Sequence, residues 1–167
     1  MAAAQPHIYS GQDFSLQRDK NRFVLPPQFR KTLRESNGGK NSMLLVKHDR
    51  WECLVGFGAS RIAELAAQLD REEELAAKAG REFDKEKRSL DLYTFEEVPF
   101  DGSGRFVLPD NLAAMAAIGN QIFLQGGGTF FTIWSPAELE KLGSDWKNAK
   151  AACASLAEKE LKKARKA

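Results

Sequence analysis

The sequence predicts a β-rich α+β fold in which two similar halves form one domain with pseudo-twofold symmetry. Three observations lead to this prediction: a five-residue motif occurs twice, similar apolar segments follow each copy in the same order, and each half is too small to bury a stable core alone. The chain has 167 residues, of which 43% are hydrophobic and 29% charged, as in soluble globular proteins. No apolar run approaches the ~20 residues that span a bilayer, so we expect no membrane partner.

The repeated motif is Arg22-Phe23-Val24-Leu25-Pro26, which recurs as Arg105-Phe106-Val107-Leu108-Pro109. Five identical residues in the same order, half a chain apart, indicate an internal duplication. Each copy follows a polar turn, Asp19-Lys20-Asn21 in the first half and Asp101-Gly102-Ser103-Gly104 in the second. The two halves are therefore expected to share one structure.

Each half is predicted to run strand, turn, strand, short helix, strand, turn, strand and long helix. The first half comprises a strand over Ile8 to Leu16, the motif strand, a helix carrying Phe29 and Leu33, strands over Met43 to Val46 and Trp51 to Phe57, and a helix with Ile62, Leu65, Ala66 and Leu69 on one face. The second half comprises a strand over Leu90 to Phe100, the motif strand, a helix carrying Leu112, Met115 and Ala116, strands over Ile122 to Gln125 and Phe130 to Ser135, and a helix carrying Leu139 and Leu142.

The predicted boundaries give a first half over residues 8–69, a charged helical linker over 70–89, a second half over 90–146 and a basic helical tail over 147–167. Ser135-Pro136-Ala137-Glu138 predicts a capping box with proline at the first helical position. Met1 to Pro6 has neither the basic start nor the apolar core of a signal peptide. We interpret that segment as a short flexible tail on a cytoplasmic protein.

The histidines and cysteines do not predict a metal site or a disulfide framework. Cys53 lies in an apolar strand-like run and Cys153 in a late helix, and no Cys-x-x-Cys pair exists. His7 and His48 are too few to complete a zinc cluster. We expect no metal, no cofactor and two unpaired structural thiols.

The small net charge of +2 hides an uneven distribution. Residues 17–34 carry six basic side chains and one acidic, and residues 147–167 carry seven basic and two acidic. Residues 58–97 carry seven basic and eleven acidic side chains. A basic segment that is balanced elsewhere allows a nearly neutral protein to hold a polyanion on one face, although charge runs are more often solvated surface.

The second copy of the motif resembles that of the MraZ family, which carries Asp-x-x-x-Arg followed by an apolar pair and a proline. Asp101 to Pro109 fits this pattern fully, and the glycine hairpin Gly126-Gly127-Gly128 and the segment Cys53-Leu54 also look like family features. The resemblance covers about residues 8–145. The first copy departs from it, because Arg18 replaces the aspartate and Asn21 the usual glycine.

The resemblance implies an AbrB-like swapped-hairpin fold, assembly into a homo-oligomeric ring, and repression by binding short direct repeats in double-stranded promoter DNA. It also implies a cytoplasmic, nucleoid-associated protein with no small-molecule substrate. The implied target lies ahead of the division and cell-wall gene cluster that includes the protein's own gene. Asn21 tolerates left-handed backbone, so the first turn can keep its form, and Asp13 or Asp19 could replace the missing aspartate.

Arginine suits a DNA-reading role because its planar fork binds guanine O6 and N7 together or clamps a phosphate. Arg22 is the first candidate, and its alternative is a structural ion pair. For Arg105 the alternative is equally strong, because Asp101 in the same turn can orient it. Further candidates for DNA contact are basic residues beside the first motif: Arg18, Lys20, Arg30 and Lys31. For those on the helix, a solvated surface without any DNA contact is an equal alternative.

Two other classes of function were compared with DNA binding. Gly126-Gly127-Gly128-Thr129 lacks the ending of a phosphate-binding P-loop and lies between two predicted strands, so a phosphate-binding enzyme is disfavoured and no catalytic residue is expected. An AbrB-like antitoxin or another partner-binding protein is the stronger alternative. Antitoxins of that type usually carry one copy of the half, which favours the regulator.

Overall fold

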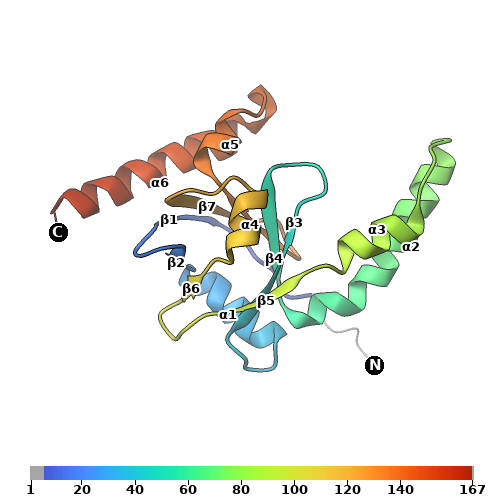
Figure 1. Cartoon of the computed structure of the whole chain (residues 1–167), viewed down its shortest axis with the longest axis horizontal. Helices are drawn as coiled ribbons and strands as arrows, with labels where there is room; N and C mark the ends of the chain where they lie inside the picture. The colour runs from blue at the N-terminus through green and yellow to red at the C-terminus, as the bar shows by residue number, and fades with distance from the viewer. Residues whose placement is uncertain (1–5, 167) are drawn as a thin grey trace.

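The computed structural model describes residues 6–166 of the chain (Figure 1). The expected N-terminal tail, Pro6 apart, lies outside the described residues. The strands of the described part are β1 (Gln12–Leu16), β2 (Arg22–Val24), β3 (Ser42–Lys47), β4 (Cys53–Phe57), β5 (Glu96–Pro99), β6 (Arg105–Val107), β7 (Gln121–Gly126) and β8 (Phe131–Trp134). The helices are α1 (Pro27–Ser36), α2 (Ile62–Lys78), α3 (Lys85–Leu92), α4 (Asp110–Met115), α5 (Pro136–Glu140) and α6 (Lys147–Lys166).

Six strands form one antiparallel sheet in the order β1-β7-β8-β4-β3-β5, and β2 and β6 pair separately as a two-stranded ribbon. The sheet order is symmetric, because exchanging each strand for its counterpart in the other half reproduces it. Strand β1 of the first half pairs with β7 of the second, and β5 of the second half pairs with β3 of the first. The predicted α+β class is confirmed, and the pairings agree with two interleaved halves.

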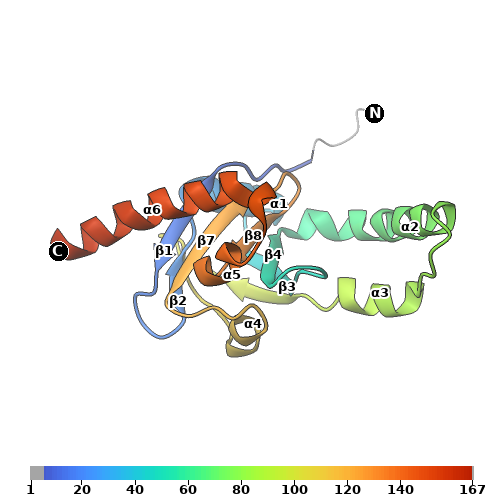
Figure 2. The same ribbon diagram turned by 90° about the horizontal axis from the view of Figure 1, so that it is seen from above.

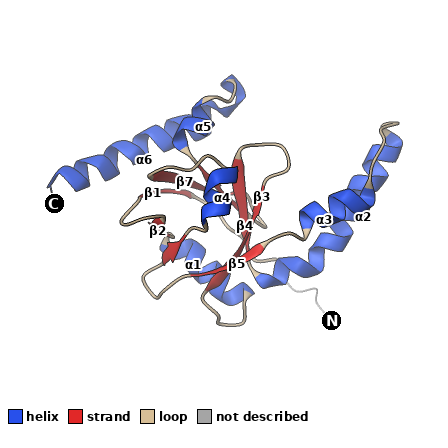
Figure 3. Ribbon diagram, in the orientation of Figure 1, coloured by secondary structure: helices blue, strands red, loops and turns tan. Residues whose placement is uncertain are grey.

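The main core lies between one face of the sheet and a layer formed by the ribbon, α1 and α4 (Figure 3). Phe29 and Leu33 are fully buried on α1, as their spacing predicted. On the other face, α5 and α6 cover Phe14, Phe123 and Trp134. Helix α6 and the hairpin of α2 and α3 extend from opposite ends of the molecule (Figure 1, Figure 2).

The prediction of a strand over Leu90 to Phe100 is wrong in its first part. Leu90 belongs to α3, and β5 begins only at Glu96. The Asp84 side chain accepts a hydrogen bond from the Lys87 N–H at 3.0 Å and so caps a new helix, which extends through the residues expected to be extended. Leu92 and Phe95 pack against α2 instead of forming a sheet face, and Leu90 is exposed.

The linker is a helical hairpin whose chain reverses between α2 and α3. Gly80 has a φ of +68° just after α2, which is the left-handed conformation that ends many helices at glycine. Leu65 and Leu69 of α2 are buried and cluster with Leu92 of α3. Ile62 of the predicted apolar face is 36% exposed and Ala66 is also exposed, so this face is narrower than expected.

Three smaller predictions need correction. The first strand begins at Gln12 because Gly11, with a φ of +85°, interrupts the extended run. Met115 ends the short helix α4 and is 43% exposed, so it does not belong to the core face. Proline does occupy the first turn of α5, but the Ser135 side chain makes no capping bond and Glu138 pairs with Lys141 at 2.8 Å instead.

Candidate nucleic-acid interface

The ribbon of β2 and β6 places the two copies of the motif side by side. Its register pairs Phe23 with Phe106 at the centre, Arg22 with Val107 and Val24 with Arg105. Successive side chains of a strand point to opposite faces, so the two phenylalanines enter the core while the arginines and valines face outward. One exposed arginine therefore stands at each of two diagonally opposite corners of the same outer surface.

The turn before β6 is held together by Asp101. Its Oδ1 accepts hydrogen bonds from the N–H groups of Ser103 and Arg105, each at 2.9 Å, and its Oδ2 accepts one from Arg105 Nε at 2.8 Å. The bond from the Arg105 N–H is the main reason why the pKa of Asp101 lies below its usual 3.8. Gly104 has a φ of +84° and fits directly against the carbonyl of Leu25, where a side chain would collide. The geometry supports the role of Asp101 in orienting Arg105.

The turn before β2 has the same backbone form with different side chains. The Arg18 N–H donates to the carbonyl of Arg22 at 2.9 Å, as the Asp101 N–H does to that of Arg105 at 3.0 Å. Arg18 thus occupies the position of the aspartate, as the alignment of the motif indicated. Asn21 adopts a φ of +55° where the second half has glycine, so the first turn keeps its form without glycine.

No carboxylate takes over the missing pairing in this first turn. Asp13 and Asp19 each accept a hydrogen bond from the backbone N–H of the next residue, at 2.7 and 2.8 Å. Within residues 6–166 Arg22 forms no ion pair, whereas Arg105 is bound to Asp101. The two arginines of the ribbon therefore differ: one is held in place and one is free to reach a ligand.

The structure brings most of the predicted basic residues to this surface. Arg18, Arg22 and Arg105 line one shallow groove along the ribbon, and Lys20 is exposed in the same turn. Arg30 reaches from α1 to the second turn, where its Nη1 lies 3.3 Å from the carbonyl oxygen of Gly102.

Two other basic residues of α1 contribute less directly. Lys31 is exposed on α1, and within residues 6–166 its side chain forms no hydrogen bond or ion pair. Arg34 of the same helix donates from its Nε to Asn41 Oδ1 at 2.9 Å. The loop between β3 and β4 lies away from the ribbon surface. Its Lys47 side chain donates to two carbonyls of the same loop, those of His48 and Trp51.

Sequence reasoning missed the residues that join the two turns to each other. The Leu108 N–H donates to the carbonyl of Asn21 at 2.7 Å, and the Leu25 N–H donates to that of Gly104 at 2.8 Å. The Asn21 side chain also donates to Asp110 at the start of α4. The symmetric repeat carried the only signal for this arrangement, since two identical strands related by a twofold axis can pair with each other around it.

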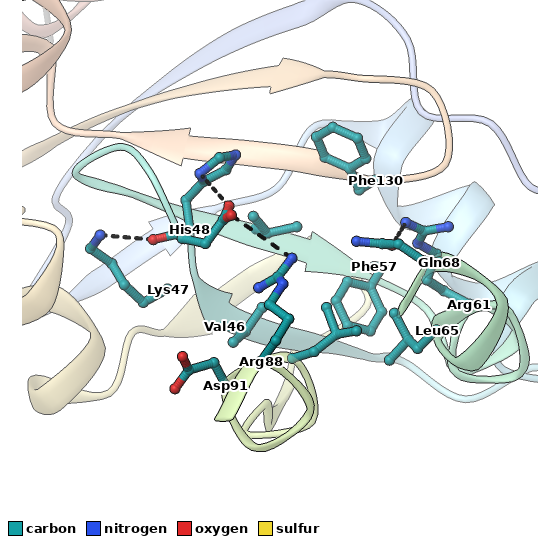
Figure 4. A pocket seen from close by; sticks show the side chains of 13 residues that line it. Val46, Lys47, His48, Phe57, Arg61, Leu65, Gln68, Arg88, Asp91 and Phe130 are labelled. Atoms are coloured by element: carbon teal, nitrogen blue, oxygen red, sulfur yellow. Dashed lines mark hydrogen bonds and ion pairs between the residues drawn. The ribbon is translucent and has the colours of Figure 1, made fainter. Parts of the chain in front are cut away.

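A separate cavity of about 160 Å³ lies between the α2–α3 hairpin and the outer face of the sheet (Figure 4). Its apolar lining includes Val46, Phe57, Leu65 and Phe130. Three lysine and arginine side chains line it, and each is paired with a carboxylate: Lys47 with Glu52 at 3.5 Å, Arg61 with Glu64 at 2.9 Å and Arg88 with Glu72 at 3.0 Å. This pairing leaves the cavity without the free positive charge of the ribbon.

The ribbon has the form and charge that a DNA-reading surface needs. The major groove of B-DNA admits a two-stranded β-ribbon, and arginine is the side chain that most often reads guanine there.

In the described part of the chain no helix has the length and apolar character of a membrane span. Nor do residues 6–166 bring together three or more side chains suited to hold a metal ion.

The chain is similar to proteins from several bacteria. It is 34% identical over 124 residues to the transcriptional regulator MraZ of Rhodospirillum rubrum, covering 72% of this chain and 75% of that protein. It is 30% identical to the MraZ proteins of Methylococcus capsulatus, covering 77% and 79%, and of Gluconacetobacter diazotrophicus, covering 73% and 75%. No protein-family profile matches the chain.

These relatives define a DNA-binding transcriptional regulator rather than an enzyme, and the fold is consistent with that class. The chain belongs to the MraZ family. The family assignment agrees with the resemblance found in the motif around Asp101.

Proposed function

We propose that this chain represses transcription by binding short direct repeats in promoter DNA through the outer face of the β2–β6 ribbon. The observation that carries the proposal is the pairing of the two motif copies, which sets Arg22 and Arg105 on one exposed surface. Arg22 contacts a base edge or a phosphate, since its guanidinium has no carboxylate partner among the described residues. Arg105, held by Asp101, contacts the phosphate backbone of the DNA and so positions the ribbon on the duplex.

The neighbouring basic residues extend this contact. Arg18 and Lys20 flank Arg22 in the first turn, and Arg30 crosses from α1 to the second turn. Lys31 lies on the exposed side of the same helix. Several such contacts with phosphate release counterions and supply most of the affinity that does not depend on sequence.

The proposal includes a closed homo-oligomer of more than two subunits. A single ribbon offers few base contacts, and linking several ribbons in one particle makes each later contact intramolecular. Direct repeats suit a ring, because rotation presents neighbouring ribbons in one sense. Trp146 does not supply the ring surface, since it packs against Trp51 and Trp134 inside this chain. Exposed apolar residues of the long helices are better candidates: Ile62, Leu75, Leu90 and Leu161.

The proposed target is the promoter ahead of the division and cell-wall gene cluster, including the protein's own gene, and the proposed location is cytoplasmic, on the nucleoid. Capturing fragmented genomic DNA with the purified full chain and sequencing it tests both target and class. Enrichment of one promoter with tandem short repeats supports the proposal. Recovery of all fragments in proportion to their length would contradict it.

A further inference from the structure

Helix α6 carries a basic end that its packing does not explain. The helix packs along β1 through Ala149, Cys153 and Leu156, all in its first half. From residue 161 to 166 every side chain is exposed. This exposed stretch and Lys159 before it provide five basic side chains: Lys159, Lys162, Lys163, Arg165 and Lys166.

The basic end lies on the side of the molecule where the first motif turn lies. Both views show α6 running past β1 and projecting beyond the body at the end where the β1–β2 loop turns (Figure 1, Figure 2). That loop carries Arg18 and Lys20, the basic neighbours of Arg22. The basic turn before β2 and the basic end of α6 therefore lie at the same end of the molecule.

The opposite end of the molecule carries charge of the opposite sign. The hairpin of α2 and α3 projects there, and its two helices with their connection hold nine acidic and six basic side chains (Figure 2). The backbone of the ribbon is almost symmetric about its centre, so it looks nearly the same from either end of the molecule. A phosphate backbone is attracted at the α6 end and repelled at the hairpin end.

We propose that the exposed end of α6 is a second DNA-contacting surface, which binds the phosphate backbone beside the site read by the ribbon and thereby fixes the direction in which each subunit sits. This inference rests on the proposed function. The backbone of the ribbon is pseudosymmetric, so within the ribbon only the difference between Arg22 and Arg105 distinguishes the two directions. A basic arm at one end and an acidic hairpin at the other distinguish them through the charge of whole elements. The ligand is the phosphodiester backbone of a double-stranded duplex.

The test replaces Lys162, Lys163, Arg165 and Lys166 together with glutamine, which removes charge while keeping good helix formers. The readout is the dependence of duplex affinity on salt concentration. We expect the log–log slope to become shallower by about 0.9 for each lost phosphate contact, and by up to about 3.6 per subunit. The preference for the repeat sequence over a scrambled duplex stays the same, because the arm reads no bases.

The matched control replaces four exposed basic residues of the hairpin with glutamine: Arg71, Lys78, Arg81 and Lys87. Both variants lose four charges, and both lose two ion pairs between side chains three or four positions apart. The control should keep the slope of the unchanged chain. Circular dichroism verifies that each variant retains its helices.

A second readout tests direction. One repeat is placed in duplexes that extend beyond it on one side only or on the other side only. The unchanged chain should bind one of the two more tightly, and the α6 variant should bind both alike. An unchanged slope and an unchanged preference in the α6 variant overturn the inference alone. A chain that binds repeats no better than scrambled DNA overturns the proposed function as well, which separates the two failures.

Discussion

Phe23 and Phe106 face each other at the centre of the ribbon, with ring centroids 6.2 Å apart and ring planes inclined by 37°. They are the same residue of the two motif copies, and both lie against the core at 2% exposure or less. Their backbones are paired directly, so the contact lies on the approximate twofold axis. This pair sets the spacing between the two outward arginines.

Replacing Phe23 with alanine should destabilise the chain by about 3–5 kcal/mol, because it removes a fully buried aromatic ring and leaves a cavity. Urea unfolding followed by circular dichroism measures the change. Val107→Ala is the control, since this side chain is 51% exposed on the outer face of the same ribbon and its loss should cost less than about 0.5 kcal/mol. Equal effects of the two substitutions would show that the ribbon does not face the core in this way.

Replacing Arg22 with alanine should weaken specific DNA binding by about tenfold or more, since a well-placed arginine discriminates a base by about 1–3 kcal/mol. The fold should remain, because no ion pair within the described residues depends on this side chain. Titration of a labelled duplex measures the loss. Arg71→Ala, which removes an exposed charge on α2, should leave the affinity nearly unchanged. Normal affinity in a folded Arg22 variant would exclude the ribbon as the reading surface.

Replacing Asp101 with asparagine should lower thermal stability near neutral pH. The pKa of Asp101 is lowered in the folded chain, mainly by the Arg105 N–H, so the ionised group stabilises the fold above its usual pKa of 3.8. That contribution is lost as the pH falls through the lower, folded-state pKa. Thermal unfolding of both proteins should therefore differ at neutral pH and converge in strong acid. A difference of constant size over this range would argue against the ionised carboxylate.

Tandem repeats should bind far better than a single repeat, by a factor of up to about 10²–10⁴ if several subunits of one particle engage together. Size exclusion with light scattering gives the mass of the particle, and titrations with one, two and four repeats give the affinities. The expected particle has more than two subunits. A monomer that holds one isolated repeat as tightly as a tandem array would refute the ring mechanism.

The repeated motif made much of the candidate site predictable. It located both turns, identified Arg18 at the position of the aspartate, and predicted that Asn21 would accept a left-handed backbone, which the φ of +55° confirms. These features are local, because a turn is determined by a few adjacent residues. The same comparison gave Arg105 a partner in Asp101 but left open a pairing of Arg22 with Asp13 or Asp19, which is absent from the described residues.

The long-range features could not be read from the sequence. Alternation of apolar residues shows that a strand has a buried face but does not identify its partner, so the reach of Arg30 to Gly102 was not foreseen. The segment beginning at Leu90 alternates like a strand, yet the cap at Asp84 and packing on α2 make its first part helical. The division of the chain at residues 69, 89 and 146 stays a prediction.

The exchange of strands between the halves determines when this protein becomes functional during its synthesis. Strand β1 has only β7 as its partner and β2 has only β6 within the described chain, so both wait for residues that the ribosome adds much later. Of its four strands, a nascent first half can pair only β3 with β4. The ribbon therefore forms only after β6 has been made, and a truncated translation product that lacks the second half has no ribbon with which to occupy a promoter.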